Sequence, residues 1–166
     1  MIDVKVKRLH PDAKLPFYAT AGSAAMDFTA VAVIQATEIV HQPGAAAGRT
    51  VIPQANIAVT KPAWWIHTGL AMEIPPGWCL KLYPRSGMGC KHHTRLANCV
   101  GIIDSDYRGE IKARLIADPH APHIAIQPGM AVMQGMFERV EQAQLVEVDE
   151  LSDTSRGAGG FGSTSK

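Results

Sequence analysis

One segment of the chain places acidic side chains between two apolar runs. Residues 98–111 pass from Asn98 through valine and isoleucine to the polar tip 104–106, and then through Tyr107 and a glycine back to apolar residues. The pattern predicts two strands joined by a turn, that is, a β-hairpin. A carboxylate beside apolar side chains loses hydration and becomes more basic, so Asp104 is a candidate general base. The alternative is that Asp-Ser-Asp only forms a turn through hydrogen bonds to the backbone.

Two further segments carry groups that suit a charged ligand. Residues 84–87, Pro-Arg-Ser-Gly, supply a fixed entry, a guanidinium, a hydroxyl and a glycine that exposes backbone N–H groups, which together could cradle a phosphate. Residues 20–28 are mostly small and lead to Asp27 in apolar surroundings. Taken alone, Asp27 could equally be a cap or a surface residue.

The last eleven residues, 156–166, are rich in glycine and poor in apolar side chains, which is typical of a disordered tail. Gly157 and Gly162 also have the spacing of a phosphate-binding P-loop. Ser163 occupies the position of the P-loop lysine, however, and no strand and helix flank the segment. The P-loop interpretation therefore fails.

Composition and charge limit the function classes. With 166 residues, 46% of them hydrophobic, the chain can form one domain with a core, and a net charge of +1 argues against a broad nucleic-acid surface. The three cysteines, Cys79, Cys90 and Cys99, lack any zinc-site spacing and predict reduced thiols in the cytoplasm. The neighbouring pair His92-His93 is expected on a strand, its side chains on opposite faces, and solvated. The N-terminus shows no signal core and no run reaches membrane-spanning length, so we expect no membrane association.

Short strands of about five residues, with turn signals between them, predict an all-β barrel or jelly roll. We expect a β domain over residues 1–151 and a flexible glycine-rich arm over 152–166. Residues 36–63 are rich in alanine and glycine and predict a mobile loop between short strands.

Five segments in order, from Thr20 to Thr164, resemble the five motifs of the trimeric deoxyuridine triphosphatases (dUTPases). Residues 20–28 are similar to the first motif, 84–89 to the second, 98–111 to the third, 130–137 to the fourth and 156–164 to the fifth. Two departures are visible. Residues 36–63 are longer than the usual spacing, and Ala131 stands where the fourth motif usually has an arginine, with Arg139 as a candidate substitute.

The resemblance implies a role for each matching residue. Asp104 would activate a water, and Asp27 would contact the waters around Mg²⁺. The residues implied in substrate binding fall into three groups. The phosphate group is Arg85, Ser86, Gly87 and Gln134; the nucleoside group is Asn98, Gly101, Ile102, Ile103, Tyr107 and Lys112; and the arm group is Arg156, Phe161, Gly162, Ser163 and Thr164. Tyr107 would stack on the deoxyribose, and Phe161 would stack on the uracil.

The resemblance further implies a jelly-roll-like homotrimer in which the C-terminal arm of one chain covers a site built by two others. The expected activity is hydrolysis of dUTP to dUMP and diphosphate, which limits uracil in DNA and supplies dUMP for thymidylate synthesis. Two alternatives stay open: a dCTP deaminase of the same superfamily, and a non-catalytic dUTP-binding regulatory protein.

Overall fold

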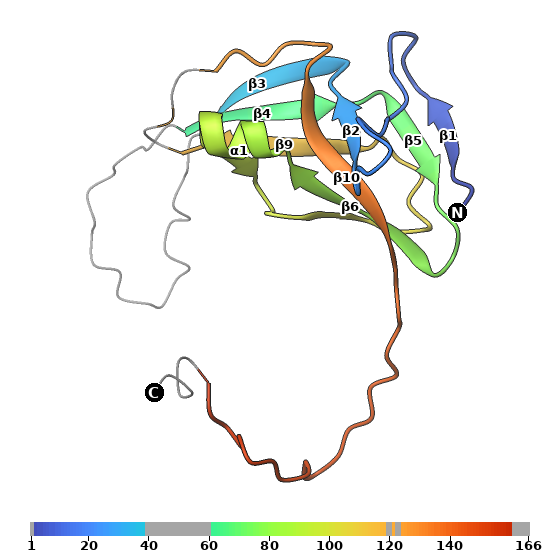
Figure 1. Cartoon of the computed structure of the whole chain (residues 1–166), viewed down its shortest axis with the longest axis vertical. Helices are drawn as coiled ribbons and strands as arrows, with labels where there is room; N and C mark the ends of the chain where they lie inside the picture. Colours follow the sequence, from blue (N-terminus) through green and yellow to red (C-terminus); the bar gives the residue numbers. More distant parts are fainter. Residues whose placement is uncertain (1, 39–60, 119–120, 122–123, 161–166) are drawn as a thin grey trace, which may run out of the picture.

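The computed structural model describes residues 2–38, 61–118, 121 and 124–160. Figure 1 shows short strands gathered into one body, one short helix beside them, and a C-terminal segment that runs away from the body. The elements in chain order are β1 (Lys5–Arg8), β2 (Met26–Thr29), β3 (Ala32–Glu38), β4 (Lys61–His67), β5 (Leu70–Glu73), β6 (Trp78–Pro84), α1 (Ser86–His92), β7 (Thr94–Leu96), β8 (Gly101–Ile103), β9 (Lys112–Ala117) and β10 (Ala131–Arg139).

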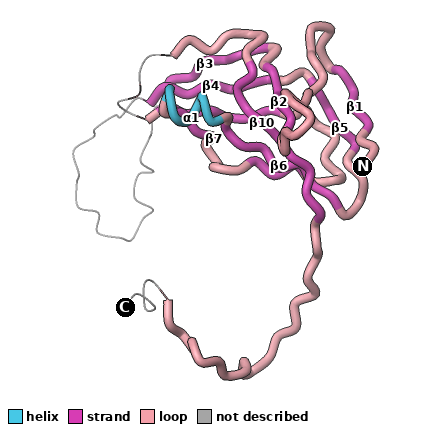
Figure 2. The backbone as a smooth tube through the Cα atoms, viewed as in Figure 1, coloured by secondary structure: helices cyan, strands magenta, loops and turns pink. Residues whose placement is uncertain are grey.

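The strands form three antiparallel sheets, which Figure 2 shows as magenta segments. One four-stranded sheet has the order β2-β10-β6-β8, the other has the order β3-β4-β9-β7, and β1 pairs with β5. The fold is therefore all-β and jelly-roll-like, as predicted, although the described sheets do not close into a barrel.

The core lies between the two four-stranded sheets. Leu80 and Leu82 of β6 point inward at 0% and 1% exposure, and Ile66 of β4 and Leu115 of β9 meet them from the other sheet at 0%. This spacing of two residues is the period that turns alternate strand side chains to one face. Each large apolar side chain contributes about 1.5–3 kcal/mol when fully buried, so the alternation fixes which face of each strand points into the core.

The predicted hairpin over residues 98–111 is wrong. β8 pairs with β6 in one sheet, whereas β9 pairs with β4 and β7 in the other. Residues 104–111 therefore cross between the sheets. The backbone N–H of Tyr107 donates to Asp104 O at 3.2 Å, which makes a local turn but does not bring the two strands together.

The helix α1 was not predicted, because Gly87 and Gly89 disfavour helix in this seven-residue segment. Tertiary contacts stabilise it: Met88 is buried, and the Thr94 hydroxyl donates to Met88 O at 2.9 Å. The expectation that His92-His93 lies on a strand is wrong, since His92 ends α1 and His93 caps it in the left-handed conformation.

The strands that flank the predicted loop are confirmed. β3 and β4 pair antiparallel from Ala32↔His67 to Glu38↔Lys61, so the ends of the predicted segment 36–63 are strand residues. Residues 39–60 lie outside the described part of the chain.

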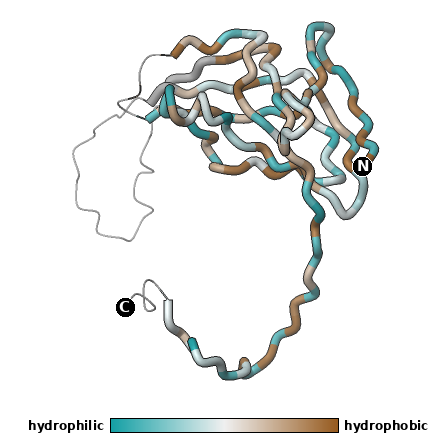
Figure 3. Tube along the Cα trace, in the orientation of Figure 1, coloured by the Kyte–Doolittle hydropathy of each residue, from teal (hydrophilic) through white to brown (hydrophobic). Residues whose placement is uncertain are grey.

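The C-terminal segment leaves the body where β10 ends, at Arg139, and residues 140–158 are all exposed. It carries apolar side chains that nothing in the described chain covers, with Leu145 92% exposed and Leu151 87% exposed. Figure 3 shows brown, hydrophobic stretches along the extended C-terminal segment. Among the described residues, no helix is both long and apolar enough to cross a membrane.

Gly135 of β10 permits the close approach of three apolar side chains. A Cβ at this position would lie 2.8 Å from Phe28 Cε2, 2.9 Å from Leu80 Cδ1 and 3.1 Å from Leu82 Cδ2. These atoms belong to the packed core and have little room to move.

We therefore expect Gly135→Ala to lower the free energy of unfolding by about 1–3 kcal/mol, the typical cost of overpacking a core. The measurement is urea unfolding at a fixed protein concentration. Gly22→Ala is the matched control, because a Cβ at Gly22 would meet nothing within 4 Å. Equal unfolding midpoints for the two variants would contradict this account of β10.

Candidate active site

An ion pair at the end of β6 brings together residues from three neighbouring strands. Asp27 of β2 stands opposite Gln134 of β10, which stands opposite Tyr83 of β6. The Arg85 Nε atom lies 2.9 Å from Asp27 Oδ1. Asp27 is only 9% exposed, and a buried carboxylate needs such a partner to offset its lost hydration.

Two further hydrogen bonds fix this corner of the sheet. Arg85 Nη1 donates to the carbonyl of Ala131 at 3.0 Å, and Gln134 Nε2 donates to the carbonyl of Pro84 at 3.1 Å. The guanidinium is thus held by a side chain on one side and by the backbone of β10 on the other. A depression borders these groups, lined by Ser23, Asp27, Tyr83, Arg85, Ser86 and Gln134. The structure therefore brings together four residues that the sequence placed at the phosphates or the metal.

The residues predicted for the nucleoside lie at the other edge of β6. Gly101, Ile102 and Ile103 form β8, which pairs with β6 as the last strand of its sheet. Ile102 is 61% exposed, and Asn98 before the strand is also exposed. Gly101 is buried and faces Leu82; a Cβ added at Gly101 would lie 3.2 Å from the Leu82 Cβ.

Asp104 follows β8 and lies beside a crevice that also involves Gly77, Cys79, Ser105 and Val140. The carboxylate is exposed in the single chain. The expected desolvation of Asp104 by its apolar neighbours is therefore wrong for one chain alone, because β8 is an edge strand with an open outer face.

Tyr107 and Lys112 diverge after the Asp104 turn. The Tyr107 hydroxyl donates to Glu110 O at 3.2 Å, and its side chain is 40% exposed. Lys112 begins β9 in the other sheet, with its Nζ atom 5.7 Å from the centre of the Trp65 ring.

Arg139 does not take the place of the arginine that the fourth motif usually has at position 131. It pairs with Trp78 at the far end of β10, and its guanidinium lies 5.4 Å from the centre of the Trp78 ring. The backbone carbonyl of Ala131 accepts a hydrogen bond from Arg85, but it supplies no positive charge in place of an arginine side chain.

Of the predicted arm residues, Arg156 lies in the described part of the chain and is not gathered with either group. Arg156 donates from Nε to Gly159 O at 2.8 Å within the exposed segment. Phe161, Gly162, Ser163 and Thr164 lie outside the described residues.

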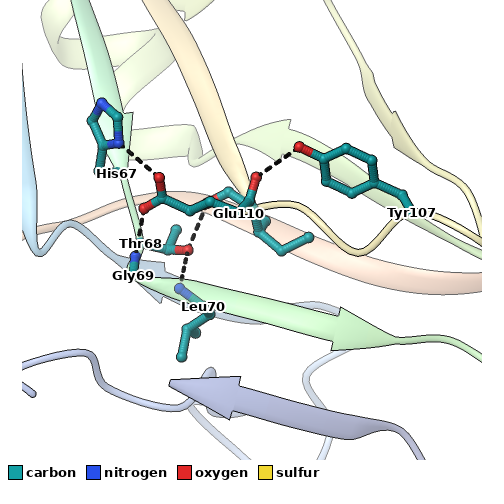
Figure 4. Close-up of polar contacts among 7 residues, drawn as sticks. His67, Thr68, Gly69, Leu70, Tyr107 and Glu110 are labelled. Atoms are coloured by element: carbon teal, nitrogen blue, oxygen red, sulfur yellow. Dashed lines mark hydrogen bonds and ion pairs between the residues drawn. The ribbon is translucent and has the colours of Figure 1, made fainter. Parts of the chain in front are cut away.

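Glu110 was not singled out from the sequence, yet it makes polar contacts with His67, Gly69 and Tyr107 (Figure 4). Its carboxylate lies 2.8 Å from His67 Nδ1 and accepts the Gly69 N–H at 2.9 Å. The available signal was a single acid between Gly109 and the apolar start of a strand, which is also common on solvated faces.

The donors around Asp27 fit a magnesium ion that arrives with a nucleotide. Among the described residues, no group of three or more His, Cys, Asp or Glu could hold a metal alone. Mg²⁺ usually takes one or two carboxylates, several waters and substrate phosphates. Arg85 already pairs with Asp27 Oδ1, so contact through a metal-bound water fits better than direct coordination by that oxygen.

Comparison with known proteins identifies the family. The sequence model of the dUTPase family matches residues 35–165. The chain belongs to the dUTPase family. It is 37% identical to the deoxyuridine 5'-triphosphate nucleotidohydrolase of Thermobifida fusca over 98% of the chain and 79% of that protein. It is 43% identical to the enzyme of the same name from Brucella melitensis over 90% of the chain and 83% of that protein.

Solved structures agree with this fold. The chain superposes on the dUTPase of Staphylococcus bacteriophage 80alpha, solved with dUPNHPP, with a TM-score of 0.72 and 21% identity over 99% of both chains. This likeness places the dUTPase-family chain among jelly-roll-like β proteins.

The three free cysteines differ in exposure: Cys79 is buried, whereas Cys90 and Cys99 are exposed. Burial raises the pKa of the Cys79 thiol, so little of it is thiolate near neutral pH. We expect a chromogenic disulfide reagent at pH 8 to titrate two thiols quickly in the folded protein and the third only after denaturation. Three fast thiols in the native protein would contradict the burial of Cys79.

Proposed function

We propose that this protein hydrolyses dUTP to dUMP and diphosphate with the help of Mg²⁺. The observation that carries the proposal is its 37–43% identity, over 90–98% of the chain, to proteins named deoxyuridine 5'-triphosphate nucleotidohydrolase. The clustered Asp27, Arg85, Ser86 and Gln134 support it, because they combine cationic and hydrogen-bonding groups at one depression.

Arg85 has the central electrostatic role. Its Nε and one Nη1 proton are used by Asp27 and Ala131 O, which orient the guanidinium and leave its other N–H groups for phosphate oxygens. Ser86 and the Gly87 backbone N–H add neutral donors, and Gln134 reaches the same depression. Donors that are fixed before the reaction stabilise developing negative charge without a reorganisation cost.

The metal completes the neutralisation of the triphosphate. Asp27 would hold Mg²⁺ through a bound water, and the ion would supply charge neutralisation at the phosphates. A buried carboxylate already held by Arg85 suits this role, because its position is fixed before the nucleotide binds.

Asp104 acts as the general base that takes a proton from the water attacking the α-phosphorus. Asn98 and the backbone of residues 101–103 hydrogen-bond the uracil, and Tyr107 packs on the deoxyribose and leaves no room for a 2′-hydroxyl. Lys112 contacts the base or the sugar. The exposed outer face of β8 supports this assignment, since its groups are accessible to a ligand.

The separation of the two groups supports a site shared between chains. Asp104 follows Ile103, the partner of Leu80, and so lies near Cys79, whereas Arg85 follows Pro84. Cys79 and Pro84 are five residues apart on β6, about 17 Å at roughly 3.3 Å per residue. One chain thus holds Asp104 and Arg85 well apart, which favours a site in which the two residues come from neighbouring chains.

The exposed C-terminal segment supports a homotrimer with exchanged arms. In a single chain the side chains of Leu145, Val146 and Leu151 are exposed to water. Contact with a neighbouring chain would bury this apolar surface, which is favourable. Residues 152–166 of one chain close over the site of others: Phe161 stacks on the base, while Arg156, Gly162, Ser163 and Thr164 bind phosphates. Closure excludes water and strengthens these contacts.

In the cytoplasm, where reduced thiols persist, the reaction limits uracil in DNA and supplies dUMP.

Asp104→Asn tests the catalytic base. We expect kcat for dUTP to fall by about 10²–10⁴-fold, the usual contribution of general base catalysis, while the nucleotide still binds. The assay measures diphosphate and ammonia released from each deoxynucleoside triphosphate in the presence of Mg²⁺. Asp118→Asn, an exposed acid at the end of β9, is the control.

The outcomes separate the alternatives. Ammonia from dCTP would support a deaminase, and dUTP binding without diphosphate in the wild type would support a regulatory binder. Full activity of Asp104→Asn would remove that residue from the mechanism.

The oligomeric state tests the shared site. Light scattering at micromolar concentration should give three times the chain mass of 17.8 kDa. A chain that ends at Leu151 should remain a trimer, at three times its own shorter chain mass, but lose most diphosphate release, because it lacks the closing arm. A chain that ends at Arg139 should lose the trimer. A monomeric, fully active wild type would rule out the shared site.

A further inference from the structure

The half-buried carboxylate of Glu110 joins the connection between Asp104 and β9 to residues 67–69, at the end of β4. Glu110 is 23% exposed in its side chain, and its partner His67 is 24% exposed. One carboxylate oxygen lies 2.8 Å from His67 Nδ1, and the other accepts the Gly69 N–H at 2.9 Å. An ionised carboxylate only accepts hydrogen bonds, so an ionised Glu110 pairs with the tautomer of His67 that donates from Nδ1. Both oxygens of Glu110 are therefore engaged by the β4–β5 connection.

The residue after Glu110 is fixed to the same connection. The buried Thr68 hydroxyl donates to Ile111 O at 2.5 Å and accepts the Leu70 N–H at 3.2 Å, and the Ile111 N–H donates to Leu70 O at 2.7 Å. Figure 4 shows the side chains of Glu110 and Thr68 side by side against residues 67–70. Residues 110 and 111 thus have a fixed place before β9 begins.

Gly69 shows how closely this connection is packed. It has a φ of +65°, and a Cβ there would lie 2.9 Å from His10 Cβ and 3.0 Å from Val31 Cγ1. Its N–H is consequently presented at one fixed position, where Glu110 accepts it.

Tyr107 takes its orientation from Glu110. The Tyr107 hydroxyl donates to the Glu110 carbonyl, and its ring fills the space beside Gly109 that any side chain would need. The Tyr107 N–H in turn donates to Asp104 O. Arg108 Nη1 donates to Ser105 O at 2.6 Å and to Tyr107 O at 3.1 Å, which holds the turn together internally. A continuous series of contacts therefore leads from His67 through Glu110 and Tyr107 to Asp104.

We infer that Glu110, held by His67, is a positioning residue for the loop 104–109, which carries Asp104 and Tyr107. The inference rests on the proposed function, because it assigns that loop to the substrate. Glu110 acts through Tyr107 and does not itself touch the nucleotide. Tyr107 binds the backbone carbonyl of Glu110, so the Glu110 side chain acts by fixing the position of that carbonyl. Without the side chain, the contacts of Ile111 alone hold this end of the loop, so the Glu110 carbonyl, Tyr107 and Asp104 are less precisely placed. An error of about 1 Å at a reacting group can cost about 100-fold in rate.

The test compares Glu110→Ala, Glu110→Gln and His67→Ala with the wild type. The measurements are kcat and KM for dUTP and for UTP with Mg²⁺, and affinity for a non-hydrolysable imido analogue of each nucleotide. Glu110→Ala should lower kcat for dUTP by about 10–100-fold and reduce the preference for dUTP over UTP, because Tyr107 no longer holds its place. Thermal unfolding shows whether each variant is folded.

The conservative variant distinguishes positioning from general stability. In Glu110→Gln the amide oxygen can still accept the Gly69 N–H, and the amide N–H can donate to the other tautomer of His67. It should therefore recover most of the activity and of the sugar preference, whereas His67→Ala, which removes one of the two partners, should fall between Glu110→Ala and the wild type. Asp12→Asn, in an exposed histidine–carboxylate pair 3.9 Å apart, is the control.

The outcomes separate this inference from the proposed function. If a folded Glu110→Ala shows the kinetics and sugar preference of the wild type, the inference is overturned. The proposed function stands in that case as long as the wild type turns over dUTP. If Glu110→Ala does not fold, unchanged values in His67→Ala would overturn the inference equally. A wild type that neither turns over dUTP nor prefers the deoxyribose analogue would overturn both.

Discussion

The pairing of β6 with a strand on each side is the constraint on which the rest of the structure depends. Along one edge, β10 and then β2 bring Gln134 and Asp27 beside Tyr83, where the chain turns into Arg85. Along the other edge, β8 pairs with residues 80–82 and points the chain toward Asp104. The inward leucines of β6 fix its register in the core, so both groups of polar residues are placed by the same apolar alternation.

The same strand also limits what one chain can do. The two groups lie toward opposite ends of β6, so one chain holds them apart. The exposed outer face of β8 and the uncovered apolar side chains of residues 140–151 are two further features that a single chain leaves unfinished. All three are accounted for together if neighbouring copies complete the site, which is the arrangement we propose.

Polar groups near the site are held by pairs that join distant segments. Asp27 is buried and paired with Arg85, which also binds the backbone at Ala131. Glu110 joins the loop after Asp104 to the β4–β5 connection. In each pair an acid that has lost part of its hydration is satisfied by donors from another strand or connection, so the partners hold those elements in register. At position 131, where the fourth motif usually has an arginine, the backbone carbonyl of Ala131 orients Arg85 but adds no positive charge.

The amino-acid sequence by itself determined the class of fold and singled out candidate residues for one polar cluster. Alternating apolar residues and turn signals are local, so they predicted short antiparallel strands, and the ordered motifs singled out Asp27, Arg85, Ser86 and Gln134, which the fold gathers at one depression. Tertiary structure decided what depends on long-range pairing. The segment around Asp104 has the local pattern of a hairpin, but β8 pairs with β6 and β9 pairs with β4, in different sheets. The helix after Arg85 forms despite its glycines because Met88 is buried, and Glu110 matters only because the fold brings residues 67–69 within hydrogen-bonding distance of it. Sequence patterns report the preference of a segment for a conformation, whereas the choice of partners is made by the packing of the whole chain.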